Sequence, residues 1–486
     1  MGTQKMEKND RHIQKIGGMM LNRFFRLQEE GTTPTRELLA GLTTFLTMSY
    51  IIFLQPAILS GALFGFETGM DFGSIFTATC IAAALATAIM ALYAKYPIAQ
   101  APGMGENFFF VFSVIPAAAS LASVQAGEAV AWQIALGVVF IAGALFVLLS
   151  VTGVRKKMMD SFSSEMKSGI AVGIGLFIAF IGLQNAGLVL NADGAFLKMN
   201  ANFNSPGIWV FFFGIITTVI LEARRIRGAV FWGILASTVF TLALRLLLKE
   251  ENYSSSTLFT LFQPSWKLFS APPSVAPTFL KMDITGAFNL TMLPFILVFL
   301  IMDVFDTMGT LVGVGKVGGF MKNNKMPRVE KAMLADAVGT VTGAALGTST
   351  VTSFIESTVG IKAGGRTGLT ALTVATLFLL ALFFAPLFAM IGSYPPITAP
   401  ALVVVGSMML KSIRKMNWDD PTEIVPSFLI MIGIPLTCSI GDGLALGFIS
   451  YPIIKLLSGR GKDVGWFGYL MSIVLIVYLV LVRSTV

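Results

Sequence analysis

Two carboxylates lie inside a long apolar stretch of this chain, where a lipid-facing helix would hold them only at high cost. Residues 289–315 contain no charged side chain other than Asp303 and Asp306. Three residues apart on a helix, the two side chains project from nearly the same face. A charge near the centre of a bilayer costs roughly 2.5–3.5 kcal/mol, so the pair indicates a polar or water-filled site within a membrane protein. The alternative is that one acid caps a neighbouring helix or pairs with a buried lysine.

The composition also indicates a membrane protein. Of the 486 residues, 55% are hydrophobic and 12% are charged, and the mean hydropathy is +0.79. The lysines and arginines behind the net charge of +8 lie mostly in short connecting segments. This distribution reflects the orientation of the chain in the membrane and does not indicate a nucleic-acid partner. The only histidine, His12, lies in the polar N-terminal tail, so proton transfer within the membrane must use carboxylates or water. The sequence has no nucleophile–histidine–acid set and no His/Cys cluster, and therefore predicts neither an enzyme nor a metal site.

Apolar segments predict an all-α polytopic membrane protein built from two halves. We expect a tail (1–37), a first repeat (38–247), a polar loop outside the membrane (248–288), a second repeat (289–458) and a C-terminal helix with its tail (459–486). The continuous spans are expected at about 38–60, 72–94, 131–152, 166–186, 208–223, 228–247, 289–315, 331–346, 367–391, 398–413, 422–437, 440–457 and 465–483. The last does not fit a seven-plus-seven count. It is a fifteenth crossing unless two of the preceding segments do not each span.

The third segment of the first half is interrupted. Pro97 and Pro102 prevent a regular helix there, and a half-helix is expected to begin near residues 103–104, after an extended stretch. A half-helix that begins at membrane depth offers unpaired N–H groups to a ligand. Glu106 and Asn107 fall in its first turn. The alternative is a kinked helix that Glu106 caps.

The second half has a matching interruption at residues 347–360, GTSTVTSFIESTVG. Its Ser/Thr run and β-branched residues favour an extended start, and Thr352 or Ser353 is expected to cap a short helix that carries Glu356. Each break lies about 60 residues after the start of its half. Paired interruptions at corresponding positions indicate a transporter binding site.

Lysine and arginine alternate between connections in a way that predicts a cytoplasmic N-terminus. The basic connections are at Lys95, 155–157, 224–227, 316–331, 362–366, 411–415 and 455–462. Partial exceptions on the opposite side are Lys198 and the loop 248–288. An odd number of spans in each half turns the second half upside down, which makes an inverted repeat.

Four motifs in the same order resemble the AzgA-like purine permeases of the nucleobase–cation symporter (nucleobase–ascorbate transporter) superfamily. They are YPIAQAPGMGENFFF, DVFDTMGTLVGV, TSTVTSFIESTVGIKAGGRTGLTA and SIGDGLALGFISY, and the resemblance extends from about Asn22 to Val482. It implies about fourteen helices in a seven-plus-seven inverted repeat with core and gate domains. Two broken helices would each follow a short β-strand. It also implies proton-driven uptake of adenine, guanine or hypoxanthine across the plasma membrane, with the proton as coupling ion and no other cofactor, and dimers are common in the superfamily.

The resemblance implies roles for individual residues. Asp303 looks like the eighth-helix acid that contacts substrate or couples protons, and Asp306 like its companion. Glu356 looks like the tenth-helix acid that hydrogen-bonds the purine and takes part in coupling. Asn107 looks like the third-helix amide near the ligand. This division agrees with the chemistry of a purine, whose N–H groups suit a carboxylate and whose mixed edge suits an amide.

One position departs from the family pattern. After GMG the family usually has an apolar residue and then Asn-Ala-Tyr-Phe, whereas Glu106 here precedes Asn107 and Phe108. The extra carboxylate leaves the purine preference and the coupling ion open. Phe108, Phe109 or Phe354 would stack on a purine ring, although phenylalanines in membrane chains more often face lipid or pack.

Other functions and residues are less favoured by the sequence. An anion transporter of the same fold should not line its site with carboxylates, and a channel should show rings of pore-lining charge. A xanthine or uracil transporter of this fold stays open. Asp336, Asp442, Lys362 and Arg366 are interpreted as structural, at boundaries, turns or helix ends.

Overall fold

The structure is a computed structural model of the chain. It describes residues 22–152, 163–192, 195–253, 256–321, 326–477 and 479–480. His12 with most of the expected tail, and the basic connection at 155–157, lie outside the described residues.

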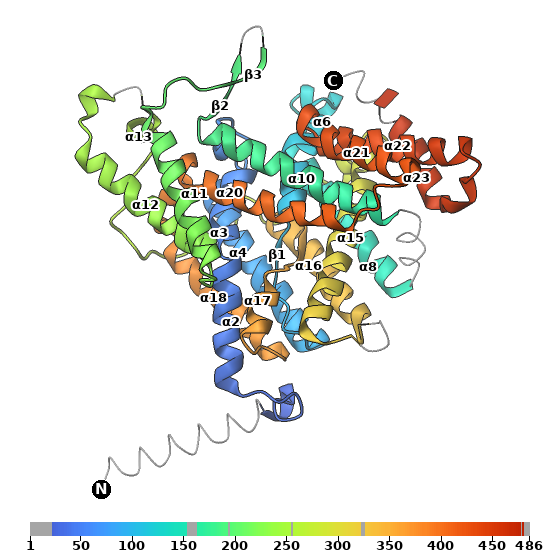
Figure 1. Cartoon of the computed structure of the whole chain (residues 1–486), viewed down its shortest axis with the longest axis horizontal. Helices are drawn as coiled ribbons and strands as arrows, with labels where there is room; N and C mark the ends of the chain where they lie inside the picture. The colour runs from blue at the N-terminus through green and yellow to red at the C-terminus, as the bar shows by residue number, and fades with distance from the viewer. Residues whose placement is uncertain are drawn as a thin grey trace.

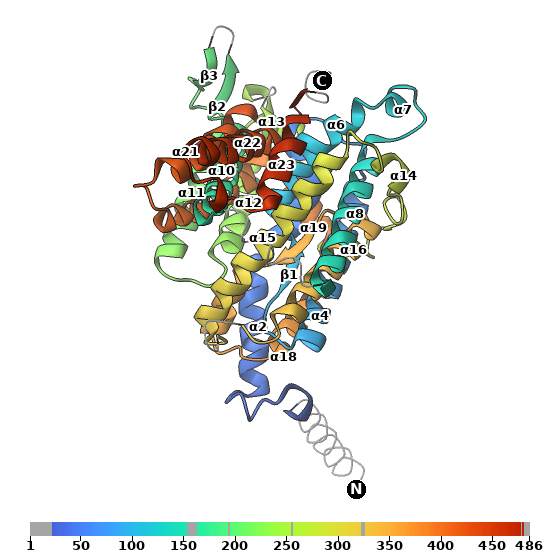
Figure 2. The ribbon, with the colours of Figure 1, turned by 90° about the vertical axis from the view of Figure 1, so that its right-hand side faces the viewer.

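Long helices from both halves of the chain form the core domain (Figures 1 and 2). They are α2 (Pro34–Met48), α3 (Tyr50–Leu59), α4 (Phe72–Ile89), α8 (Ala131–Thr152), α15 (Leu293–Gly318), α16 (Val329–Leu346), α18 (Gly368–Ala381) and α19 (Ala385–Gly392). Helix α16 packs on α8 and α4, and α18 packs on α2 and α4. The core domain therefore interleaves the two halves instead of stacking one upon the other.

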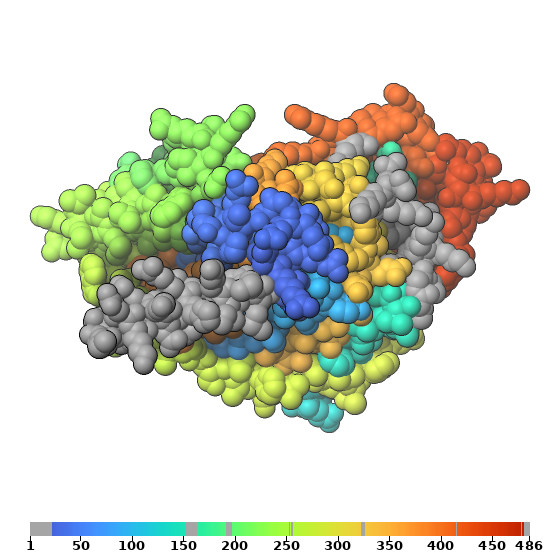
Figure 3. Space-filling view, turned by 90° about the horizontal axis from the view of Figure 1, so that it is seen from below, coloured from blue at the N-terminus to red at the C-terminus, as the bar shows by residue number. Residues whose placement is uncertain are grey.

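The remaining long helices form the gate domain, which lies alongside the core. They are α10 (Ser164–Asn185), α11 (Pro206–Ala223), α12 (Ala229–Leu247), α20 (Pro395–Met409), α21 (Pro421–Thr437) and α22 (Ile440–Leu457). Helices α10 and α20, the fifth of each half, run side by side (Figure 1). A Cβ on Gly175 would lie 2.7 Å from the Gly406 carbonyl oxygen, so glycine permits backbone contact between them. Seen from the end where the chain begins, α11 and α12 lie on one side of the core helices and α21 and α22 on the other (Figure 3).

Both expected interruptions are present, and they pair with each other. Strand β1 (Gln100–Pro102) runs antiparallel to β4 (Val351–Ser353), with Gln100 opposite Ser353. Two further backbone bonds extend the pairing, from Gly103 N to the Thr350 carbonyl (3.1 Å) and from Phe354 N to the Ala99 carbonyl (2.9 Å). Each strand thus gives the other the backbone partners that lipid cannot supply.

A short helix follows each strand. After β1 come α5 (Met104–Phe109), the π-helical turn η3 (Phe110–Val114) and α6 (Ile115–Ala119), and after β4 comes α17 (Ser357–Lys362). The half-helix start near residue 104 is confirmed. One detail is wrong: Thr352 and Ser353 lie in β4, and Glu356 is the residue before α17 instead of part of it.

The count of spanning segments agrees with the inverted-repeat expectation. By length and composition, ten described helices are suited to cross a membrane. Helices α16 and α21 and the two interrupted segments bring the total to fourteen segments, seven in each half. Helix α23 (Trp466–Val477), with 12 residues, follows the second set as a shorter apolar helix.

A buried carboxylate fixes the N-terminal end of α18 against α2. Glu37 is fully buried and accepts hydrogen bonds from the backbone N–H groups of Arg366, Thr367 and Thr370. The hydroxyls of Thr367 and Thr370 also donate to it, at 2.9 and 2.6 Å. The carboxylate thus satisfies five donors at the start of α18, where backbone N–H groups otherwise have no partner. Arg366 in turn donates to the Gly318 carbonyl at the end of α15, a structural contact as expected.

The outer connections contain the remaining elements. A hairpin of β2 (Val189–Ala192) and β3 (Ala195–Met199), which the sequence analysis did not anticipate, projects from the end opposite the N-terminus (Figure 1). The short helices α7 (Ala122–Gln125), α13 (Thr257–Thr260) and α14 (Ile284–Ala287) lie in connecting segments. The loop before α15 is held to the core, because the Pro273 carbonyl accepts from the Thr77 hydroxyl at 2.9 Å and Asp283 N donates to the Gln133 carbonyl at 2.8 Å.

Candidate functional site

The paired strands bring both half-helices against the middle of α15. Thr352, at the centre of β4, lies 3.0 Å from the Thr307 hydroxyl and donates to Asp306 Oδ2 at 3.3 Å. Strand β1 lies on the other side of β4. The segments that carry Glu106, Asn107, Asp303, Asp306 and Glu356 therefore meet at one place, although nearly 250 residues separate the two interruptions.

One face at this place is uncovered. Asp306 is exposed although it lies halfway along the 26 residues of α15. A Cβ on Gly309, the next residue along this face, would meet no atom within 4 Å. Ile355 is 48% exposed, and Glu356 beside it is half-buried. A carboxylate exposed to lipid at mid-helix would be costly, so this open face indicates a polar passage.

Glu356 is held at the edge of the open face by the first span. The Tyr50 hydroxyl donates to Glu356 Oε1 at 2.8 Å. Tyr50 is 3% exposed and lies where α2 gives way to α3. The hydrogen bond fixes the direction of the carboxylate. No sequence pattern marked Tyr50.

Glu106 is buried and folds back over the start of its own helix. A Cβ on Gly103 would overlap Glu106 Oε2 and would lie 3.0 Å from Thr352 Cγ2. The carboxylate thus occupies the space that the missing side chain leaves beside β4. Glu106 is 3% exposed, so it does not line the open face.

Asn107 is fully engaged within the protein. Its amide group donates to the Gln55 side-chain carbonyl and accepts from the Ser349 hydroxyl. The Gln55 amide continues the network to the Thr348 hydroxyl at 2.8 Å. The network ties α3 and α5 to the residues before β4. A role of Asn107 in ligand binding stays a prediction.

Asp303 points into the core, in contrast to Asp306. It is 2% exposed, and its Oδ2 accepts from the Thr340 hydroxyl at 2.8 Å. Among the described residues, no hydrogen-bond partner reaches its Oδ1. Thr340 also lies within 3.0 Å of the Val351 carbonyl. Asp303 is therefore linked through one hydroxyl to the backbone of β4.

Asp336, on α16, accepts more side-chain hydrogen bonds than Asp303, Asp306 or Glu356. Its Oδ1 accepts from the Gln100 amide and the Ser353 hydroxyl, each at 2.8 Å, and its Oδ2 from the Thr307 hydroxyl at 2.6 Å. Gln100 and Ser353 are opposite each other in the strand pair, so Asp336 joins both strands to α15. The sequence did carry a signal, because the argument that singled out Asp303 applies equally to a lone acid in the apolar run from residue 332 to 355.

The candidate stacking residues Phe108, Phe109 and Phe354 are all buried. The Phe108 ring lies 5.6 Å from that of Phe177 on α10, and the Phe112 ring lies 5.5 Å from it. This aromatic cluster closes α5 and η3 against the gate domain. Phe354 is 6% exposed. Stacking on a purine stays a prediction for all of them.

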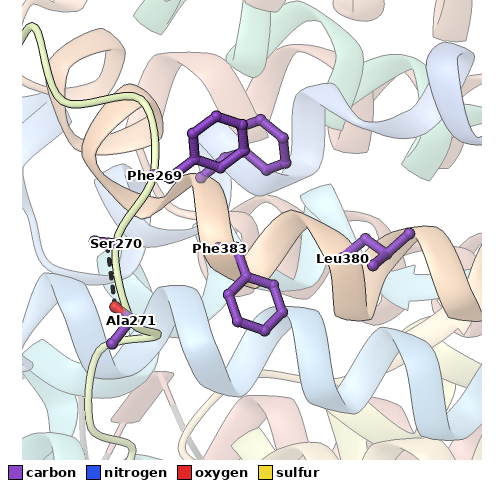
Figure 4. Close-up of a pocket in the computed structure, with 6 residues that line it drawn as sticks. Phe269, Ser270, Ala271, Leu380 and Phe383 are labelled. Atoms are coloured by element: carbon purple, nitrogen blue, oxygen red, sulfur yellow. Dashed lines mark hydrogen bonds between the residues drawn. The ribbon is translucent and has the colours of Figure 1, made fainter.

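An apolar groove elsewhere does not qualify as the site. It lies between the loop before α15 and the end of α18, lined by Phe269, Ser270, Ala271, Leu380, Phe383 and Phe384 (Figure 4). Its only side-chain polar group, the Ser270 hydroxyl, already donates to the Ala271 carbonyl at 3.0 Å. In the part of the chain that the structure describes, no three His, Cys, Asp or Glu side chains are arranged to hold a metal ion.

Comparisons with known proteins agree with this geometry. A family model described as the permease family, Xan_ur_permease, matches residues 35–445. The chain is 41% identical to the guanine/hypoxanthine permease PbuO of Bacillus subtilis over 440 residues, 90% of this chain and 96% of that protein. It is 39% identical to the adenine permease AdeP of Escherichia coli over 451 residues, 93% and 94% of the two chains.

A solved structure has the same fold. The transmembrane domain of the cyanobacterial bicarbonate transporter BicA matches with a TM-score of 0.57 at 16% identity, covering 85% of this chain and 97% of that one. At this identity the likeness concerns the fold alone. It confirms the expected inverted-repeat architecture.

Proposed function

Because this chain belongs to the Xan_ur_permease family of permeases, we propose that it imports purine nucleobases by proton symport with alternating access. The observation that carries the proposal is the open face halfway along α15, where Asp306 is exposed and Glu356 is half-buried beside the paired strands. Relatives at 39–41% identity that are named as adenine and guanine/hypoxanthine permeases support the substrate class.

Glu356 is the residue best placed to bind the purine. Its carboxylate lies at the edge of the open face, and the Tyr50 hydroxyl fixes its direction. A carboxylate accepts hydrogen bonds from purine N–H groups. Asp306 is the second acceptor on the same face. An anionic substrate is disfavoured, because it would meet two carboxylates there.

The proton is carried by the acids of the site. A carboxylate in a low-dielectric site is costly to keep charged, and protonation removes that cost. Asp303, Asp306 and Glu356 are the groups we assign to coupling. Their neutralisation would let the loaded core domain move past the gate domain. The carboxylates and water supply this chemistry without a further cofactor.

The orientation follows from charge. With the N-terminus in the cytoplasm, the end of α15 at Lys316 is cytoplasmic, and the uncovered face runs from Asp306 to Gly309 in its direction. The aromatic cluster of Phe108, Phe112 and Phe177 closes the site on the side away from Lys316. The conformation is then inward-facing, in a plasma-membrane protein that we expect to form homodimers.

Uptake of labelled adenine into cells that lack their own purine permeases tests the proposal. Unlabelled adenine, guanine, hypoxanthine, xanthine and uracil compete at several external pH values. We expect competition by purines, faster uptake at acid external pH, and loss of accumulation with a protonophore. Competition by uracil alone contradicts the substrate class, and uptake that follows a sodium gradient and ignores pH contradicts proton symport.

A further inference from the structure

Two threonine hydroxyls connect the exposed Asp306 to the buried Asp336. Thr352 donates to Asp306 Oδ2 at 3.3 Å and lies 3.0 Å from the Thr307 hydroxyl. Thr307 donates to Asp336 Oδ2 at 2.6 Å. Thr352 is 2% exposed, whereas Thr307 and Asp336 are completely buried. A continuous line of four oxygen-bearing groups thus runs from the open face into the core domain.

The hydroxyl protons of Thr352 and Thr307 allow two arrangements of the hydrogen bonds along this line. Each hydroxyl has one proton to donate and can accept another. When Thr307 donates to Asp336, Thr352 can donate either to Thr307 or to Asp306, but not to both. The two hydroxyls can therefore point together toward Asp336 or together toward Asp306. Which arrangement is favoured depends on which carboxylate holds a proton.

We propose that Thr352 and Thr307 relay a proton between Asp306 and Asp336, so that Asp336 stores the coupled proton. This inference rests on the proposed proton symport. Protonated Asp306 gives its proton to Thr352 Oγ1 while Thr352 gives its own to Thr307 Oγ1 and Thr307 gives its own to Asp336 Oδ2. One O–H bond breaks and one forms at each hydroxyl. The net change is a neutral Asp336 and a charged Asp306.

The hydrogen bonds of Asp336 leave one of its oxygens facing the relay. Its other oxygen is held by the Gln100 amide and the Ser353 hydroxyl, which lie in the strand pair and not on the open face. The Thr307 side is thus the route to the open face. Within the described residues, the other titratable groups near the relay are Asp303 on α15, Glu106 from α5 and Glu356 with Tyr50. Lys167 of α10 lies over the ring of Phe305, the residue before Asp306, at 5.1 Å.

Storage away from the open face has a mechanical consequence. Asp336 joins both strands to α15, so a change in its charge alters the hydrogen bonds that hold the crossing. Asp306 becomes charged again after the transfer and is free to meet the next proton or the purine. The relay thereby separates proton storage from purine binding.

The test compares proton flux with purine exchange in proteoliposomes that contain a pH-sensitive dye. The variants are Thr352→Val and Thr307→Val, which keep the side-chain shape and remove the hydroxyl. Purine-coupled proton flux should fall about tenfold or more, because a positioned proton-transfer group contributes at least that much. Counterflow of labelled purine, which needs no net proton movement, should persist.

Three control variants separate the relay from packing. Thr352→Ser and Thr307→Ser retain the hydroxyl and should restore proton flux. Thr342→Val removes a hydroxyl whose bonds, within the described residues, go only to the carbonyls of Val338 and Gly339 on α16, and it should behave as wild type. If a valine variant does not fold, Thr352→Ala or Thr307→Ala takes its place, since alanine also has no side-chain proton to transfer.

The outcomes distinguish this inference from the function on which it rests. Wild-type protein that moves purine without protons overturns both the relay and proton symport. Coupled proton flux that survives in both valine variants overturns the relay and leaves proton symport standing. Loss of counterflow together with proton flux assigns the threonines a structural role and also overturns the relay.

Discussion

The Tyr50 hydroxyl donates a 2.8 Å hydrogen bond to Glu356 Oε1, joining the first span to the turn before α17. The two residues come from opposite halves of the chain. Glu356 is the residue before α17, and the Tyr50 hydroxyl fixes the direction of its side chain.

Removing this hydroxyl should weaken purine binding. A hydrogen bond to a charged group contributes about 1.5–3 kcal/mol, so Tyr50→Phe should raise KM about tenfold or more with a smaller change in maximal rate. Initial-rate uptake measures both. Tyr394→Phe, at a buried tyrosine beside Phe262 in the gate domain, is the matched control. An unchanged KM in Tyr50→Phe contradicts the positioning role.

Glu356→Gln should reduce affinity for the purine itself. The amide keeps the shape but replaces one acceptor oxygen with a donor, which faces a purine N–H unfavourably. Binding of labelled purine to the purified protein should weaken by about tenfold, as expected for loss of a charged hydrogen bond. Wild-type affinity in this variant counts against the ligand role of Glu356.

Asp303→Asn should separate accumulation from exchange. Asp303 is buried away from the open face, so the variant should retain purine counterflow while it loses proton-driven accumulation. Uptake against a gradient, with and without a protonophore, measures the first, and exchange from preloaded vesicles measures the second. Full active uptake would remove Asp303 from the coupling groups.

Gly103→Ala should displace the Glu106 carboxylate. A Cβ there would lie 2.9 Å from Glu106 Cδ, which is too close for van der Waals contact. We expect strongly reduced uptake from the single variant. The double variant Gly103→Ala/Glu106→Ala should be less impaired than the two single losses combined, because the clash is gone. Additive losses would show that Gly103 acts through other neighbours.

Glu37→Ala should destabilise the core domain. It leaves five donors at the start of α18 without their carboxylate, and even one unsatisfied buried group costs about 1–3 kcal/mol. Thermal unfolding in detergent should show a clear fall in Tm. Glu29→Ala, which removes an exposed partner of Arg26, should change Tm little. Equal Tm values in the two variants would contradict the capping role.

The interruptions were predictable because their signals are local. Pro97 and Pro102 exclude a continuous helix by their own geometry, and the Ser/Thr run after Gly347 favours extended backbone. The pairing of β1 with β4 was not derivable from those signals. Its register depends on residues far apart in the chain, such as Gln100 and Ser353.

The roles of the acids were harder to assign from the sequence. Asp303 and Asp306 are three residues apart, which leaves about 60° between their directions on a helix. That angle is enough to turn Asp306 to the open face and Asp303 to Thr340. The sequence favours a structural or boundary position for Asp336 and does not reveal the three donors around it, because they come from segments far apart in the chain.

The pairing of β1 with β4 also sets an order of events during biosynthesis. Gln100 leaves the ribosome about 250 residues before Ser353, its partner. Until then the first interrupted segment lacks the backbone partners that β4 supplies, although the Thr87 hydroxyl on α4 bonds Gln100 N and its carbonyl at 2.9 Å each. An open strand edge is unstable in the bilayer. The first half must therefore wait in a protected state, against the insertion machinery or a membrane chaperone. A truncation anywhere before β4 should leave an incomplete core that quality-control proteases remove.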